Sequence, residues 1–368
     1  MNNPLNEIIG QQKVKTILQK IIDSKRIPHA ILFSGKEGVG KEFTAIQFAK
    51  LLVLQSSDIN NKDSIINSIS NLNEPYIKYI IALPRSKNER DNDSPYDKLK
   101  PDEIALIQSE LQKKIINPYY SIEIPNANNI RINSIREISN FISFSYEGNY
   151  KRIIILSNAH LMRSEAQDAL LKNLEEPPDN IIFILCTSHP ELLKETILSR
   201  CWNISFENLT NKEIEQILVK FFNIESETAS KISKISSGSV KTAMQYLDYD
   251  FDSLIEKVIK ILRYSFGKKF HSALDEMEEV IADKVYFKLI ITLIILWFSY
   301  FNKFRHSNFE IPLIQFDQTI RKFSQKYSDL DLINIFQFLD ELNYKLDRNI
   351  NPNIIGSNLV VKLSSIIS

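Results

Sequence analysis

The sequence predicts an α/β domain built on a parallel sheet, followed by a small helical region and an all-helical C-terminal domain. Three observations lead to this prediction. Short, continuously apolar segments alternate with amphipathic helical segments over the first 206 residues, as in sheets covered on both faces. A glycine-rich loop joins the first apolar segment to the helix that follows. Beyond residue 206 the strand signals cease, and every strong pattern is helical.

Each element of the α/β domain is predicted from its own pattern of apolar residues. The expected helices are 13–23, 43–52, 103–114, 130–144 and 164–175, and the expected strands are 30–33, 120–124, 152–156 and 180–186. The last helix is stopped by Pro177 and Pro178. The polar stretch at about 55–101 has a centre, 85–95, with almost no apolar residues, which predicts an exposed loop.

We therefore expect three domains. A P-loop α/β domain covers 1–206 and contains a polar insertion at about 55–101. A helical lid of three short helices covers 207–249, and a helical bundle covers 250–368. Aromatic and aliphatic side chains over 285–301 surround more than one helix face, which indicates a bundle core or, for a minority of them, a subunit interface.

Composition excludes several classes of protein. The 368 residues carry 45 basic and 45 acidic side chains, and this neutrality argues against a large phosphate-binding surface. Two cysteines exclude a disulfide framework and a four-cysteine zinc site. The first residues do not resemble a signal peptide, and the longest apolar run, 289–301, is shorter than the ~20 residues of a membrane span. We expect a cytoplasmic protein that does not contact membranes.

The glycine-rich loop fits the spacing of a P-loop in every place but the last. The backbone N–H groups of Gly35, Gly38 and Gly40 would face phosphate oxygens. Lys41 would reach the outer phosphates, but Glu42 stands where a serine or threonine should hold Mg²⁺. Glu42 would instead ligate a metal or pair with Lys41. A glycine turn that only joins strand to helix is the alternative, so binding of ATP or ADP without turnover stays open.

A second site of nucleotide chemistry is expected where the strand 152–156 ends. A P-loop ATPase needs an aspartate for Mg²⁺ and a glutamate to activate water at this place. Ser157 and Asn158 occupy these positions, and neither can supply the charge or the base. Two metal-site defects predict that the chain has no ATPase activity of its own. His160 nearby is either a base or, more simply, a strand-end histidine with a local hydrogen bond.

Longer motifs resemble bacterial DNA polymerase III clamp-loader subunits, an AAA+ family. The matching segments are Ile27–Lys41, Ser164–Pro178, Thr196–Cys201 and Arg348–Pro352. The resemblance is strongest over 8–206 and implies an AAA+ domain, a lid and a helical collar that joins a pentamer. Within the family, the degenerate metal positions point to the delta-prime type of subunit. A gamma/tau-like, ATP-hydrolysing motor subunit is the alternative.

The resemblance also implies partners and a function. The chain would be a stator in a hetero-pentamer with gamma/tau and delta subunits of a DNA polymerase III holoenzyme. The assembly would place the sliding clamp on primed DNA. Relatives commonly carry a four-cysteine zinc module after the P-loop helix, but this chain has no cysteine over 55–101, so we expect no zinc.

Three residues acquire candidate roles by this resemblance. Arg200, in Ser199-Arg-Cys201, would act in trans as an arginine finger on a neighbouring subunit's ATP. Its alternative is an ordinary surface arginine. Thr187 stands at the place of a γ-phosphate sensor or only caps its strand. Lys241 stands where active relatives carry a sensor arginine, and an exposed helix lysine is its alternative.

Overall fold

The structure is a computed structural model that describes residues 3–56, 61–85, 93–143, 151–306, 310–327, 330–347 and 350–366. The chain divides into two compact units. The first comprises Met1–Ser233 and Ser237–Lys241, and the second comprises Lys234–Ser236 and Thr242–Ser368. Part of the loop predicted at 85–95, residues 86–92, lies outside the described residues, as do Arg348 and Asn349 of the closing motif.

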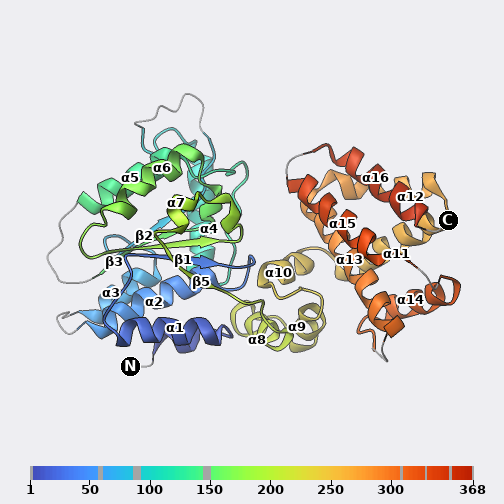
Figure 1. The fold of residues 1–368 in the computed structure, drawn as a ribbon, viewed down its shortest axis with the longest axis horizontal. Helices are drawn as coiled ribbons and strands as arrows, with labels where there is room; N and C mark the ends of the chain where they lie inside the picture. The colour runs from blue at the N-terminus through green and yellow to red at the C-terminus, as the bar shows by residue number, and fades with distance from the viewer. Residues whose placement is uncertain are drawn as a thin grey trace. The chain divides into compact units, whose positions relative to one another are not determined.

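A five-stranded parallel sheet forms the centre of the first unit (Figure 1). Its strands are β1 (Ala30–Ser34), β2 (Ile77–Ile80), β3 (Arg152–Leu156), β4 (Ile181–Thr187) and β5 (Trp202–Ser205). They lie in the order β2-β3-β4-β1-β5. Ile31 pairs with Ile184 on one side and with Trp202 on the other. Every residue of β1, β3 and β4 is buried, which explains why these strands are continuously apolar.

Helices cover both faces of this sheet (Figure 1). The helices of the first unit are α1 (Gln12–Asp23), α2 (Lys41–Gln55), α3 (Lys62–Ser70), α4 (Pro101–Ile116), α5 (Ile132–Ser143), α6 (Ser164–Glu175), α7 (Glu195–Leu198), α8 (Asn211–Phe222) and α9 (Ser226–Ser233). One core layer joins β1, β3 and β4 to α5, α6 and α7, with Phe183, Ile138 and Leu170 fully buried in it. The parallel sheet with helices on both faces confirms the predicted fold class.

One strand predicted in this unit is absent, and two strands were not predicted. Residues 120–124 form no strand; Ile122 and Ile124 instead pack against a small cluster around Ile107 without pairing their backbone. The edge strand β5 was not predicted. The stretch at 55–101, taken for a polar insertion, contains α3 and the other edge strand, β2. Edge strands bury less of their surface, so the middle of β2 carries a lysine and a tyrosine rather than an apolar run.

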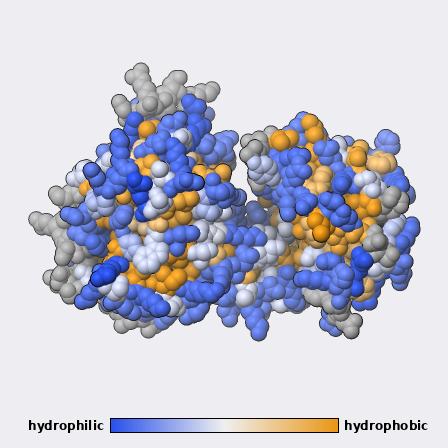
Figure 2. Space-filling view, in the orientation of Figure 1, coloured by the Kyte–Doolittle hydropathy of each residue, from blue (hydrophilic) through white to orange (hydrophobic). Residues whose placement is uncertain are grey.

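The second unit is helical throughout its described part, as the sequence predicts. Its helices are α11 (Phe251–Phe266), α12 (Phe270–Ala282), α13 (Lys284–His306), α14 (Ile314–Lys326), α15 (Leu332–Asp347) and α16 (Pro352–Ser365); α10 (Val240–Asp248) begins in the first unit and continues in the second. Hydrophilic residues cover most of the face in view, and hydrophobic residues reach the surface in patches (Figure 2). The boundaries 206 and 249 stay a prediction.

Helix α13 is the core helix of the second unit. It contacts α11, α12, α14 and α15, and Phe287, Ile290 and Phe298 are fully buried. Among the described residues, α13 is the one helix that is both long enough and apolar enough to cross a membrane. However, 56% of its most apolar 18-residue stretch is buried inside the protein. Burial by neighbouring helices explains the apolar composition without a bilayer.

Candidate nucleotide-binding site

The glycine-rich loop connects β1 to α2, as predicted. Gly38 and Gly40 have positive φ angles of 74° and 91°, which L-residues with side chains rarely adopt. Gly38 also meets the lid: a Cβ atom there would lie 2.5 Å from the backbone nitrogen of Lys241. The N–H of Val240 donates to the Gly38 carbonyl at 3.0 Å. Gly38 therefore permits a close contact between the loop and the start of α10.

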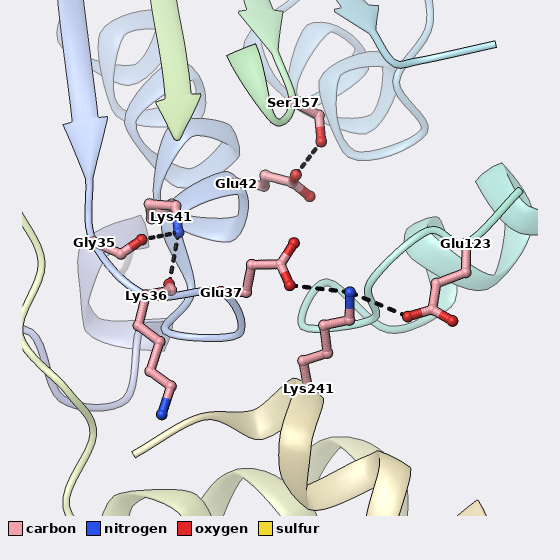
Figure 3. A network of polar contacts seen from close by, with 8 residues as sticks. All are labelled: Gly35, Lys36, Glu37, Lys41, Glu42, Glu123, Ser157 and Lys241. Carbon is pink, nitrogen blue, oxygen red and sulfur yellow. Dashed lines mark hydrogen bonds and ion pairs between the residues drawn. The ribbon is translucent and has the colours of Figure 1, made fainter. Parts of the chain in front are cut away.

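Lys41 is folded back onto its own loop. Its Nζ donates to the carbonyl oxygens of Gly35 and Lys36, each at 2.6 Å (Figure 3). The side chain is buried, and burial lowers the pKa of its ammonium. To reach a phosphate, Lys41 must first give up both carbonyl partners.

Glu42 is the centre of a buried polar network. Its carboxylate accepts hydrogen bonds from the hydroxyls of Ser157 and Tyr79, the latter at 2.7 Å, and pairs with the Lys114 ammonium at 2.6 Å. Burial by itself would raise the pKa of Glu42, but Lys114 and the two hydroxyls outweigh it and hold the pKa at about 2. Glu42 is therefore ionised at neutral pH. Glu42 was predicted to ligate a metal or to pair with Lys41, but in the structure it pairs with Lys114 and the two hydroxyls instead.

The two positions that diverge from an ATPase are thus bonded to each other. Ser157 follows β3 directly, and its hydroxyl donates to Glu42 at the start of α2 (Figure 3). A Mg²⁺ ion does not fit this arrangement, because the Lys114 ammonium already neutralises the carboxylate. Among the described residues, no group of three or more His, Cys, Asp or Glu side chains could hold a metal. Asn158 lines the same pocket, in a left-handed conformation with a φ of 48°.

Lys241 closes the loop from the lid side. Its Nζ lies 3.1 Å from carboxylate oxygens of both Glu37 and Glu123 (Figure 3). Burial lowers the pKa of Lys241, but the two carboxylates outweigh it and raise that pKa overall. A second contact joins the same parts: Lys36 Nζ donates to the Ser237 carbonyl at 2.9 Å. The alternative of a solvated helix lysine at Lys241 is wrong, since its side chain is 23% exposed and holds two carboxylates.

Little free space remains between these groups. The cavity at the loop has a volume of about 50 Å³ and is lined by Glu37, Lys41, Glu42, Lys114, Tyr119 and Lys241, among others. Sites for nucleotide-sized ligands usually have volumes of about 300–1,000 Å³. ATP or ADP would therefore need the Lys241 contacts to open before it could enter.

Thr187 and His160 make local contacts at the end of β4. The Thr187 hydroxyl accepts the backbone N–H of His189 at 3.0 Å and lies 3.1 Å from His160 Nδ1. Burial, together with the neighbouring His189, lowers the pKa of His160 to about 4, so its ring is neutral at pH 7. This geometry is that of a strand cap. A sensor role for Thr187 stays a prediction.

Arg200 lies apart from this network, after α7. Its guanidinium pairs with Glu175 at 2.7 Å and donates to the Thr196 carbonyl at 2.9 Å. Glu175 ends α6 and belongs to the segment 164–178, so two sequence motifs meet here. The Arg200 side chain is 35% exposed, and Trp202 two residues later is 52% exposed.

Sequence analysis missed Lys114, Tyr79 and Glu123 as site residues. For Lys114 a signal was present: with Ile107 and Glu110 it lies at helical spacing on the buried face of α4. A charged residue on a buried face needs a partner, and for Lys114 that partner is Glu42. Tyr79 lies on a strand that was not predicted, and Glu123 lies where a strand was wrongly predicted.

The fold and the loop define a P-loop α/β protein in which Glu42, at the start of α2, and Ser157, after β3, are bonded to each other. A profile of the family described as DNA polymerase III, delta subunit matches residues 10–210. The chain belongs to this family of clamp-loader subunits.

Individual known proteins resemble the chain to different extents. The delta' subunit of Bacillus subtilis DNA polymerase III is 23% identical over 98% of the chain and 97% of its own length. The tau subunit of the same organism is 23% identical over 97% of the chain, but the chain spans only 61% of that relative. A solved gamma-subunit-related protein of Thermotoga maritima is 15% identical, with a TM-score of 0.41, over 95% of this chain and 99% of its own.

Proposed function

We propose that the chain is a delta-prime-like stator of a DNA polymerase III clamp loader and does not hydrolyse ATP. The bond between Glu42 and Ser157, with Lys114 as its counter-ion, carries this proposal. In a P-loop ATPase these two places hold Mg²⁺ and the groups around it. Here they hold each other, and an ammonium supplies the positive charge. The full-length match to a delta' subunit supports the same conclusion.

Catalysis would be impaired even if nucleotide entered. Phosphoryl transfer depends on positioned positive charge and a group that orients the attacking water. Lys41 is held by two carbonyls, and Asn158 offers an amide where a water-activating carboxylate is needed. His160 is neutral at pH 7, but its Nδ1 faces Thr187. The loop then serves as a rigid joint between the sheet and the lid, through Glu37 and Lys241.

Arg200 would act on a partner's ATP. Its pairing with Glu175 is an exposed ion pair, of a kind worth about 0–1 kcal/mol, so a neighbour's phosphate could displace it at low cost. A guanidinium in such a position is worth about 10³–10⁵ in rate where it has been measured. This role agrees with the resemblance of Ser199-Arg-Cys201 to the clamp-loader motif.

The proposed partners are gamma/tau and delta subunits in a hetero-pentamer, and through that assembly the sliding clamp and primed DNA. The helices α11–α16 would form the collar that joins it. The neutral net charge supports DNA contact through the assembly rather than through a large basic surface of this chain alone. We place the protein in the cytoplasm, with the replication machinery.

Two measurements test this proposal. The chain alone, with Mg²⁺ and primed DNA, should show no ATP turnover above background. Robust turnover would instead establish an ATP-hydrolysing, gamma/tau-like motor subunit, the alternative that the similarity to tau supports. In a loader reconstituted with gamma/tau and delta, Arg200→Ala should slow ATP turnover at the one site that Arg200 faces by about 10³ or more, and so lower total turnover, while the pentamer still forms. Arg26→Ala is the control, because Arg26 is also an exposed arginine and lies far from Arg200 in the sequence. Normal ATP turnover by the loader that contains Arg200→Ala would contradict the role of Arg200 as an arginine finger.

A further inference from the structure

A groove in the second unit contains none of the residues on which the loss of ATP hydrolysis and the arginine finger are argued. It lies between α11 and α14 and has a volume of about 390 Å³. Phe266, Trp297 and Phe323 form its apolar floor, with ring centroids 4.6–6.0 Å apart. This volume is large enough for one or two large apolar side chains, and all the residues around it belong to one compact unit.

The rim of the groove is basic. Arg263, Lys322 and Lys326 line it and are exposed, and none of the described residues lining it is acidic. The nearby carboxylate of Asp317 is held by Arg321 at 2.8 Å. Because the whole chain has as many acidic as basic residues, three cations around one apolar floor are a local departure from the average. The groove is complementary to an apolar group with negative charge beside it.

The ring geometry favours a protein segment over nucleic acid. Bases bind single-strand sites by stacking on exposed aromatic faces. Trp297 is 1% exposed and Phe323 8% exposed, and the two rings meet edge to face at 77°. The Trp297 indole N–H is already bonded to Thr319 Oγ1 at 3.0 Å. Trp297 and Phe323 are therefore too buried to serve as a platform for a stacked base, which favours an inserted apolar side chain.

We propose that this groove docks a short segment of another protein, in which a large apolar side chain is flanked by aspartate or glutamate. The apolar side chain would pack against Phe266 and Phe323. The flanking carboxylates would face Lys322 and Lys326, which lie one helical turn apart on α14. The groove is independent of the P-loop, so this proposal and the proposed function succeed or fail separately.

Selection from a random peptide library on the intact chain tests the proposal. The counter-selection target is the Lys322→Glu/Lys326→Glu variant, whose thermal unfolding should match that of the parent. We expect enriched peptides to carry Asp or Glu beside Leu, Ile, Phe or Trp. Binding of a synthesised peptide is then followed in the Trp202→Phe background, where Trp297 is the one remaining tryptophan of the chain's two. Trp297 emission should change on binding.

Matched controls separate the groove from general charge attraction. The Lys212→Glu/Lys234→Glu variant has the same net charge, and both of its lysines are exposed outside the groove. Reversal at Lys322 and Lys326 should weaken binding about tenfold or more, and the control pair should not. Enrichment without acidic residues, or equal binding to the reversed variant, would overturn the proposal. Quenching of Trp297 by oligo(dT) in competition with the peptide would reassign the groove to nucleic acid.

Discussion

Replacing Lys114 with methionine keeps a long unbranched side chain and removes the ammonium that faces Glu42. The carboxylate would then remain in a site where Lys114 is 4% exposed and Glu42 is 18% exposed, with only the Ser157 and Tyr79 hydroxyls as partners. The Tyr120 carbonyl would also lose its 2.7 Å bond from Lys114. We expect the first unit to be strongly destabilised at neutral pH.

The pKa of Glu42 sets the magnitude. A shift from 4.5 to about 2 corresponds to stabilisation on the order of 3 kcal/mol at neutral pH, and much of it comes from Lys114. Breaking a buried ion pair by removing one partner typically costs about 3–5 kcal/mol. Lys114→Met should therefore lower the free energy of unfolding of the first unit by about 3 kcal/mol at pH 7.

Native-state hydrogen exchange read by mass spectrometry can follow the two units separately, with peptides from α11–α16 as an internal reference. Lys172→Met is the matched control, because Lys172 is an exposed lysine on another helix of the same unit, α6, and its loss should cost far less. Adding Glu42→Gln to Lys114→Met should restore at least half of the loss, since no charge is then left unpaired.

The pH dependence gives an independent check. Without Lys114, only the two hydroxyls oppose burial, so we expect the pKa of Glu42 to rise and the folded variant to take up a proton at a higher pH than the folded parent does. The difference in the free energy of unfolding between the variant and the parent should therefore become smaller as the pH falls from 7 to 4. A cost below about 1 kcal/mol, or a double variant no more stable than the single one, would refute the role given to Lys114.

Other outcomes follow from the same network. The low pKa of Glu42 stabilises the fold above pH 4.5, and this stabilisation is lost as the pH falls toward 2. The lowered pKa of His160 makes a second contribution, which is lost as the pH falls from 6.5 to about 4. In thermal melts of His160→Gln, the melting temperature should therefore depend less on pH than in the parent between pH 6.5 and 4, and equally between pH 4 and 2. Gly38→Ala should cost at least about 1–2 kcal/mol in urea unfolding, because φ is positive and the new Cβ would meet Lys241, and an unchanged midpoint would contradict this. Lys241→Met should speed amide exchange at 237–241, since Glu37 and Glu123 lose their common cation; unaltered exchange would show that the lid is held by other contacts.

The fold was predictable wherever burial on both faces gives a strong pattern. The helix 164–175 and the strand 152–156 have the predicted bounds: the helix buries Ala166, Leu170 and Leu174 at helical spacing, and every residue of the strand is buried. The edge strands β2 and β5 were not predictable in this way, since two of the four residues of β2 are only partly buried and three of the four residues of β5 are exposed. Alternating apolar residues at 120–124 suggested a strand, yet such residues can pack into a core without any backbone pairing.

The site was predictable only where it lies in one stretch of sequence. Spacing alone identified the loop and the unusual residues Glu42 and Ser157. It could not show that these two bond to each other, because 115 positions separate them. Lys114 and Lys241 come from still other elements, brought together by packing on the sheet and the lid.

The position of β1 in the sheet has a consequence for synthesis of the protein on the ribosome. This strand is made early, but its neighbours β4 and β5 begin at residues 181 and 202, about 150 residues later. At a translation rate of about 5–20 residues per second, β4 is completed roughly 8–30 s after β1. During this time the edges of β1 and the apolar residues of α2 lack the strands that cover them. The nascent chain should therefore depend on chaperones until residue 205 has left the exit tunnel, and a pause before β4 should increase aggregation more than one after β5.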